Sequence, residues 1–406
     1  MKKTKLLSIV LAALISCGTF AGCSSEEQTS SETEAAAEST TAAETTETTP
    51  AAPEAAVLTS ETAKLLGRTH LIDDTLWCGF SGTGAEFEYT GKKLDITFAA
   101  DSAAAGNMDN RARAAVYVNG ERVLDEMLDM PKETFTVYES DSAETVNVKI
   151  VKLSETAMST FGIMPIVLGE GETIAPAAEK AHKIEFIGDS ITCGYGVDDE
   201  DKTHHFSTAT EDVTKAYAYK TAEALDADYS MVSISGYGVI SGYTNDPNVK
   251  VDAQTIPQYY DNLGFSYNKF ANSQSPQDID WDFSGFTPEI VVINLGTNDE
   301  SYCKGSLEKQ TEFVEGYKKL LADVRAKNPD AEIFCAFGVM GAGMLTSVME
   351  AAITFSEETG DTKVHYVQLP TQDGSLGYAA DWHPTEGTHE LAAEVLVNEI
   401  KTVMGW

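Results

Sequence analysis

Four short, largely apolar runs recur after residue 183, each separated from the next by a stretch long enough for a helix. Such runs are typical of strands buried on both faces, and their alternation with helices indicates a parallel sheet covered on both sides. We therefore predict an α/β domain over residues 179–406. The predicted strands are 184–187, 231–234, 290–293 and 333–336, and the predicted helices include 216–225, 307–327 and 390–403.

Residues 58–178 show a different pattern, in which apolar and polar residues alternate in short runs broken by turn residues. Period-two alternation with Gly and Asn-Gly turns is typical of half-buried antiparallel strands. This part of the chain is therefore predicted to form a β-sandwich of the jelly-roll type. The alternating runs are 86–89, 94–98, 115–118, 134–138 and 146–150.

Residues 1–23 resemble the signal peptide of a bacterial lipoprotein. A basic stretch precedes an apolar run that is too short to span a bilayer, and small residues then lead to Cys23. In the lipobox of such proteins this cysteine becomes the lipidated first residue. We expect lipidation at Cys23 and an extracellular protein anchored to the cell membrane. Cys17 also fits the pattern, and plain secretion is the alternative.

Residues 24–57 consist almost entirely of Ser, Thr, Glu, Ala and Pro. A segment without large apolar side chains cannot offset the entropy of ordering. We expect a disordered linker, extended by repulsion among its Glu residues, that holds the folded part away from the membrane.

The composition argues against several classes of partner. A formal net charge of −36 disfavours nucleic acid, which is bound by clustered Lys and Arg. The cysteines that follow the signal peptide show no CxxC spacing, so neither a zinc knuckle nor a disulfide scaffold is expected. We expect Cys78, Cys193, Cys303 and Cys335 to be buried thiols.

Residues that can carry chemistry follow three of the predicted strands, and a further set lies near the C-terminus. In open α/β sheets a ligand lies beyond the carboxyl ends of the strands, so segments that follow strands are candidates for a site. The four segments are 188–191 (GDSI), 235–238 (SGYG), 295–299 (LGTND) and 381–384 (DWHP).

These four segments together resemble the blocks of the SGNH (GDSL-type) hydrolases, and most closely those of carbohydrate esterase family 2. The resemblance implies a flavodoxin-like sheet behind a jelly roll. It also implies a serine esterase that removes O-acetyl groups from plant polysaccharide such as xylan or glucomannan, without a cofactor or metal. The family supplies a Ser, a Gly, an Asn and a His, which match Ser190, Gly236, Asn298 and His383.

The chemistry of these residue types agrees with those roles. Ser190 lies at a turn from strand into helix, and a serine hydroxyl needs a base such as the imidazole of His383 to become a nucleophile. The anionic oxygen of the tetrahedral intermediate needs fixed donors. By the resemblance these are the backbone N–H groups of Ser190 and Gly236 and the amide of Asn298, with Gly238 as the alternative glycine.

The group that orients the imidazole is open at this point. The general family pattern places an Asp three residues before the His, where this chain has Ala380, and Asp381 lies only two residues before it. We predict that Asp381 orients His383. The alternative is a Ser-His dyad in which a backbone carbonyl replaces the carboxylate.

Several other residues receive lesser predictions. Tyr237 and Trp382 are the first candidates for a face on which a sugar ring stacks, ahead of Tyr195, Tyr243 and Trp281.

His204 and His205 lack metal-ligand spacing and are predicted to lie in a solvated loop. Asp189 and Asp299 are expected to hold turns through backbone N–H groups, and His389 to lie at a helix start.

Two other functions fit the same residues. The machinery could cleave other short acyl esters, as a lipase-like hydrolase does, or the chain could be a non-catalytic glycan-binding lipoprotein. We expect a monomer whose partners are an acetylated glycan and, through the lipid anchor, a membrane.

Overall fold

The computed structural model describes residues 54–406. The predicted signal peptide with Cys17 and Cys23, and the linker up to residue 53, lie outside the described residues. The expectation that the linker extends to residue 57 is wrong, because β1 (Glu54–Ala56) pairs antiparallel with β10 (Ile166–Leu168). Strand pairing uses backbone groups, so a segment of small residues can add to an open edge without large apolar side chains.

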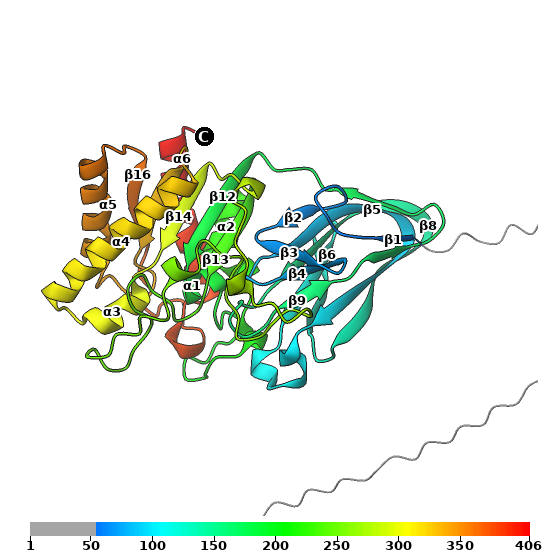
Figure 1. The fold of residues 1–406 in the computed structure, drawn as a ribbon, viewed down its shortest axis with the longest axis horizontal. Helices are drawn as coiled ribbons and strands as arrows, with labels where there is room; N and C mark the ends of the chain where they lie inside the picture. Colours follow the sequence, from blue (N-terminus) through cyan, green and yellow to red (C-terminus); the bar gives the residue numbers. More distant parts are fainter. Residues whose placement is uncertain (1–53) are drawn as a thin grey trace, which may run out of the picture. The chain divides into compact units, whose positions relative to one another are not determined.

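The first part of the described chain is an antiparallel β-sandwich, as predicted (Figure 1). Its two longest strands, β5 and β8, pair along most of their length, with register shifts at Gly91/Lys93 and Leu94/Asp95. Their inward side chains, such as Phe87, Phe98 and Ile150, form an apolar core. Besides β1 and β10, the strands are β2 (Lys64–Leu66), β3 (Thr69–Ile72), β4 (Thr75–Cys78), β5 (Gly84–Ala100), β6 (Arg113–Val118), β7 (Glu121–Met127), β8 (Lys132–Lys152), β9 (Phe161–Ile163) and β11 (Thr173–Pro176).

The second part is built on a parallel sheet with strand order β13-β12-β14-β15-β16. The four apolar runs predicted from the sequence form four of these strands. The fifth, β16, lies at the edge and is only partly buried, which is why its sequence lacks a continuous apolar run. The strands are β12 (His182–Gly188), β13 (Ala227–Ser233), β14 (Ile290–Asn294), β15 (Glu332–Phe337) and β16 (Val364–Gln368).

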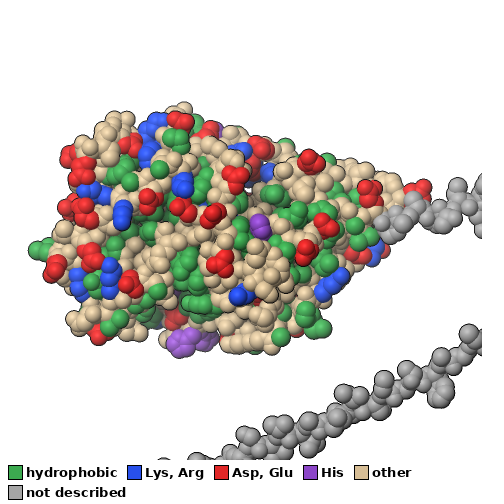
Figure 2. Space-filling view, in the orientation of Figure 1, with side chains coloured by type: hydrophobic (Ala, Val, Ile, Leu, Met, Phe, Trp, Pro, Cys, Tyr) green, Lys and Arg blue, Asp and Glu red, His purple; other side chains and the backbone are tan. Residues whose placement is uncertain are grey.

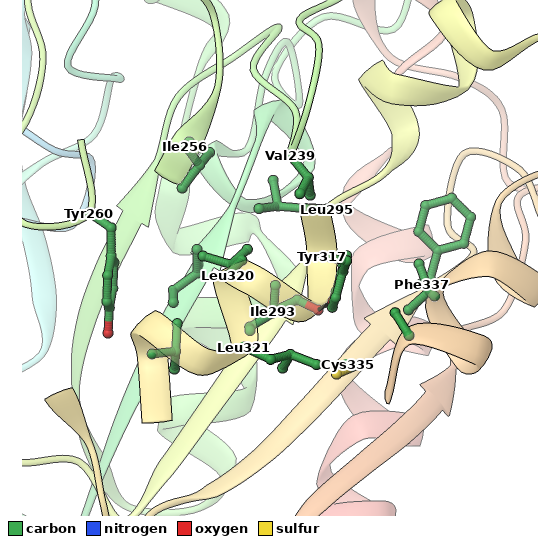
Figure 3. Close-up of a cluster of buried hydrophobic side chains, with 14 of the residues drawn as sticks. Val239, Ile256, Tyr260, Ile293, Leu295, Tyr317, Leu320, Leu321, Cys335 and Phe337 are labelled. Carbon is green, nitrogen blue, oxygen red and sulfur yellow. Dashed lines mark hydrogen bonds between the residues drawn. The ribbon is translucent and has the colours of Figure 1, made fainter. Parts of the chain in front are cut away.

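Helices cover both faces of this sheet. On one face α4 and α5 pack against the strands, and Figure 3 shows Leu320 and Leu321 of α4 beside Ile293 and Cys335 of the sheet. On the other face α2 and α6 pack against residues such as Phe186. The helices are α1 (Ser190–Cys193), α2 (Tyr217–Ala224), α3 (Thr297–Cys303), α4 (Leu307–Lys327), α5 (Leu345–Thr359) and α6 (Glu386–Met404).

The sandwich and the sheet domain belong to one compact unit and meet through buried polar contacts. Arg68 of the sandwich is fully buried, donates to the carbonyl oxygens of Tyr260 and Asn262, and lies 3.2 Å from a carboxylate oxygen of Glu185 on β12. Lys64 on β2 pairs at 2.9 Å with Asp228 on β13. Apolar side chains add to these contacts, because Leu66 and Val151 of the sandwich lie in the same buried cluster as Phe186 of the sheet domain.

The distribution of charged side chains on the surface can be compared with the acidic composition of the sequence. On the face shown in Figure 2, Lys and Arg side chains are scattered among acidic ones and do not gather in one patch. Over residues 54–406, no helix has both the length and the apolar character needed to cross a bilayer.

Candidate active site

The ends of three neighbouring strands place the candidate residues at one sheet edge. In the parallel register Gly188 of β12 pairs with Ser233 of β13 on one side and with Asn294 of β14 on the other. The segments that follow these strands therefore leave the sheet side by side. They carry Ser190 and Gly236 and, in α3, Asn298.

Ser190 begins the short helix α1 directly after β12. The carboxylate of Asp189 caps this turn by accepting the N–H of Ile191 at 3.0 Å, as expected from the sequence. Ser190 is 6% exposed, so only a small part of its surface reaches solvent.

The imidazole of His383 meets this serine across 193 positions of sequence. His383 Nε2 lies 2.9 Å from Ser190 Oγ, and Nδ1 lies 3.2 Å from the carbonyl oxygen of Ala380. A carbonyl oxygen only accepts, so Nδ1 carries the proton and Nε2 is free to accept the proton of Ser190. Burial lowers the pKa of His383 to about 4, which leaves the ring neutral at neutral pH.

The prediction that Asp381 orients His383 is wrong. The Asp381 carboxylate instead accepts the hydroxyl of Tyr195 at 2.6 Å and lies 3.4 Å from Nδ1 of His205. Asp381 has a left-handed backbone with φ of 49°, and in this conformation the Ala380 carbonyl, not the carboxylate, faces the imidazole. The arrangement matches the alternative, a dyad with a backbone carbonyl.

Tyr195 supports the imidazole from its face. Its ring stacks on that of His383 with centroids 3.9 Å apart and planes 24° apart. The same tyrosine is held by the bond of its hydroxyl to Asp381. The aspartate therefore acts on the histidine indirectly, through the ring that packs against it. The sequence suggested Tyr195 only as a sugar platform.

Of the two glycines in the second block, Gly236 has the free donor. Its φ is +80°, and within residues 54–406 no acceptor is bound to its N–H. Gly238 donates its N–H to Gln254, and a Cβ there would lie 2.1 Å from the carbonyl oxygen of Ser241. Gly238 is thus required for close packing, and Gly236 is placed to bind an anion.

Asn298 lies in the first turn of α3 and is almost completely buried. Its Nδ2 lies 2.9 Å from the carbonyl oxygen of Tyr237 and 3.2 Å from a carboxylate oxygen of Asp189. Burial, together with the charge of Asp299, raises the pKa of Asp189 to about 7. A substrate oxygen that binds this amide would compete with the longer of the two contacts.

Asp299 fixes the loop that follows Gly236, as expected from the sequence. Its carboxylate accepts the N–H groups of Val239, Ile240 and Ser241 at 2.8 to 3.1 Å. Burial raises the pKa of Asp299 to about 6, and these three donors oppose the shift. The loop that carries Gly236 is therefore tied to the helix that carries Asn298.

The two predicted stacking residues differ in position. Tyr237 is only 3% exposed and packs among the rings of Tyr259 and Phe265, so the prediction that it offers a sugar platform is wrong. Burial of the Tyr237 ring among these aromatic side chains removes apolar surface from water, which favours this position over an exposed one. Trp382 is 52% exposed and lies beside Tyr378, with the ammonium of Lys202 4.1 Å from its ring centroid.

His204, His205 and His389 lie where the sequence predicted them. His204 and His205 are exposed, and His204 pairs with Asp199. His389 lies in the first turn of α6 and accepts the N–H of Tyr217. The four expected thiols are free and buried.

One buried cluster near the site was not predicted from the sequence. Glu155, which follows β8, Cys193 and Glu211 present oxygen and sulfur atoms within 4.8 Å of one another. Burial and the two carboxylates raise the pKa of the Cys193 thiol well above its usual value, and a protonated thiol is not a metal ligand. Lys152, fully buried beside the cluster, already supplies a positive charge.

Comparison with known families matches both parts of the chain. Residues 186–391 match the GDSL-like Lipase/Acylhydrolase family. Residues 65–177 match the family described as Carbohydrate esterase 2 N-terminal.

Similar proteins carry names that agree with these families. The cellulase/esterase CelE of Acetivibrio thermocellus is 33% identical over 346 residues, which are 81% of this chain and 38% of that protein. An acetylxylan esterase / glucomannan deacetylase of Cellvibrio japonicus is 24% identical over 348 residues, which are 84% of this chain and 89% of that protein. This chain therefore spans well under half the length of CelE and most of the second relative.

A solved structure has the same fold over nearly its whole length. It is a family two carbohydrate esterase from Clostridium thermocellum in complex with cellohexaose, with a TM-score of 0.72 and 31% identity. The similarity covers 85% of this chain and 99% of that one.

Proposed function

Because the chain belongs to the GDSL-like lipase/acylhydrolase family, and within it to carbohydrate esterase family 2, we propose that it is a serine esterase that removes O-acetyl groups from plant cell-wall polysaccharide. The observation that carries the proposal is the 2.9 Å contact between Ser190 Oγ and the unprotonated Nε2 of His383. The names of the relatives point to xylan and glucomannan as substrates.

The proposed reaction uses groups of this chain alone. Ser190 Oγ attacks the acetyl carbonyl carbon while His383 Nε2 takes its proton, and the C=O bond becomes a C–O⁻ bond. The N–H groups of Ser190 and Gly236 and the amide of Asn298 bind that oxyanion. As the intermediate collapses, the sugar oxygen leaves with the proton from His383. Water, activated by the same imidazole, then hydrolyses the acetyl-serine to acetate.

The orientation of the imidazole supports this cycle. When His383 is protonated, its Nδ1–H remains bonded to the Ala380 carbonyl, and the negative charge of Asp381 favours the imidazolium. The ring needs no rotation between taking and returning the proton, because Tyr195 stacks on its face.

Acetate release from acetylated xylan and acetylated glucomannan tests the proposal. The wild-type chain should release acetate from at least one of them, and Ser190→Ala should reduce the rate at least about a thousandfold. Ser230→Ala is a matched control, because Ser230 on β13 is also buried and its hydroxyl has no hydrogen-bond partner within residues 54–406. Its activity should be unchanged.

Other outcomes would favour other functions. Faster hydrolysis of p-nitrophenyl butyrate than of the acetate would indicate an esterase for longer acyl groups. Glycan binding without any ester hydrolysis would indicate a binding protein.

We also propose that the protein is an extracellular lipoprotein anchored through Cys23, on the basis of the N-terminal sequence. Metabolic labelling with a radioactive fatty acid should mark the wild type and Cys17→Ala but not Cys23→Ala. Labelling of Cys23→Ala with loss of label in Cys17→Ala would move the anchor to Cys17.

A further inference from the structure

A carboxylate of the sandwich domain contacts the loop that carries Gly236. Glu155 lies in the segment that follows β8 and is 1% exposed. Its Oε2 accepts the backbone N–H of Ser235 at 2.7 Å. Ser235 directly precedes Gly236, so this contact joins the sandwich to the loop that offers the free N–H.

Glu155 is itself held firmly. Its backbone N–H donates to a carboxylate oxygen of Glu211 at 3.0 Å, and its carbonyl oxygen accepts the ammonium of Lys152 at 2.7 Å. The Sγ of Cys193, in the helix that begins with Ser190, lies 3.9 Å from Oε2. The carboxylate therefore lies between the loop of Gly236 and the helix of the serine.

The loop needs such support because Gly236 cannot provide it. With φ of +80° and open space where a Cβ would lie, this glycine has no side chain that could fix its orientation. Its neighbours set the peptide planes instead. The N–H of Tyr237 donates to Ile234 and the carbonyl of Gly236 accepts from Tyr243, which leaves the N–H of Ser235 to Glu155.

We propose that Glu155 is a positioning residue for the esterase reaction, because its carboxylate holds the Ser235 N–H and thereby keeps the Gly236 N–H aimed at the oxyanion. The inference rests on the proposed function. It makes the sandwich domain part of the apparatus that stabilises the transition state.

The chemical character of the cluster fits a role beyond folding. Two buried carboxylates, Glu155 and Glu211, face the single ammonium of Lys152, and burial raises the pKa of both acids. Apolar side chains of the same volume would be less costly to bury. An acceptor for the Ser235 N–H is what an apolar side chain could not supply.

Two conservative variants separate reach from charge. Glu155→Gln keeps the length of the side chain and an oxygen acceptor but loses the charge. Glu155→Asp keeps the charge but withdraws the acceptor by about 1.5 Å, one carbon–carbon bond. Kinetics with p-nitrophenyl acetate give kcat and KM for each variant, at a temperature at which all variants are folded by circular dichroism.

If Glu155 acts by position, Glu155→Gln should retain kcat within about threefold, whereas Glu155→Asp should lose about tenfold or more with KM nearly unchanged. The proposal is overturned if Glu155→Asp keeps the wild-type kcat, or if Glu155→Gln loses as much as Glu155→Asp. The second result would show that any change of this side chain disturbs the site, so the position of the acceptor alone does not explain the loss.

Lys64→Met is the matched control for loss of a contact between the domains. Lys64 pairs with Asp228 at the start of β13, whereas Ser235 lies just past the end of the same strand. The control should lower the melting temperature but leave kcat unchanged. If Lys64→Met loses as much kcat as Glu155→Asp, then loss of any contact between the domains slows the reaction, and the proposal is overturned.

The outcomes also separate this inference from the proposed function. If Ser190→Ala retains full activity, the proposed function fails, and the role of Glu155 fails with it. If Ser190→Ala is inactive while Glu155→Asp is fully active, the function stands and only the role of Glu155 is lost.

Discussion

The carbonyl oxygen of Ala380 lies 3.2 Å from Nδ1 of His383, at the side of the ring opposite to Ser190. A neutral acceptor there fixes the tautomer of the imidazole but adds less negative charge than a carboxylate would. Asp381→Asn should keep kcat within about tenfold, because Asn can still accept the hydroxyl of Tyr195 and only the charge that favours the imidazolium is lost. Steady-state kinetics with p-nitrophenyl acetate measure this. A loss near the ten-thousandfold found when a triad aspartate is replaced would contradict the dyad.

The acid limb of the pH profile, where activity rises with pH, should lie at low pH. His383 acts as a base only when it is neutral, so kcat/KM should rise with pH through the pKa of about 4 and level off above about pH 5. Tyr195→Ala exposes the ring to water and should move this limb up toward the ordinary histidine value near 6.5. Rates from pH 3.5 to 8 for both proteins test the shift. A wild-type limb near 6.5 would be inconsistent with a desolvated imidazole.

Removal of the Asn298 amide should slow chemistry and hardly affect binding. Asn298→Ala should lower kcat about a hundredfold or more, equivalent to about 3 kcal/mol of transition-state stabilisation, with a smaller change in KM. Asn248→Ala is the control, because within residues 54–406 this exposed side chain bonds only to Asp246. Equal kcat in wild type and Asn298→Ala would remove the amide from the oxyanion site.

Trp382 should matter for glycan and not for a small ester. Its half-exposed ring offers a stacking face worth about 1 kcal/mol, so Trp382→Ala should raise KM for acetylated xylan about fivefold. The kinetics with p-nitrophenyl acetate should stay within about twofold. Equal effects on both substrates would instead indicate that the tryptophan shapes the loop of His383.

The buried pair of Arg68 and Glu185 should tolerate the loss of both charges better than the loss of one. Arg68→Met leaves the Glu185 carboxylate without its cation and should lower the free energy of unfolding by about 3 to 5 kcal/mol. Adding Glu185→Gln should restore part of that loss, because the unpaired charge is then gone. Urea denaturation of the single and double variants gives both numbers. Additive losses would mean that the two side chains do not interact.

The sequence predicted the sheet domain well because its determinants are local. Apolar runs such as 290–293 must be buried, and the residues that follow parallel strands meet at one edge whatever the details of the loops. Ser190 and His383 were located on these grounds together with the family resemblance.

The errors concern side-chain direction, which depends on backbone conformation that spacing does not reveal. Asp381 was assigned to the imidazole from its distance along the chain, but its left-handed φ turns the carboxylate to Tyr195. Tyr237 was assigned to the surface from its neighbours, but its ring points into a cluster of aromatic side chains. Glu155 lies in no motif, and only the folded contact between the domains brings it to Ser235.

Arg68 and Glu155 of the sandwich are buried against the sheet domain. The two halves of this protein therefore cannot be exchanged freely for those of other proteins. Each half has its own sequence signature, yet the buried apolar clusters of the sheet domain include side chains of the sandwich, and polar groups of one half bond to the other. A chimaera that joins this esterase domain to a foreign sandwich would inherit unpaired carboxyl and amide groups at the junction. In such a protein, fusion points chosen from family boundaries alone would cut through a shared interior.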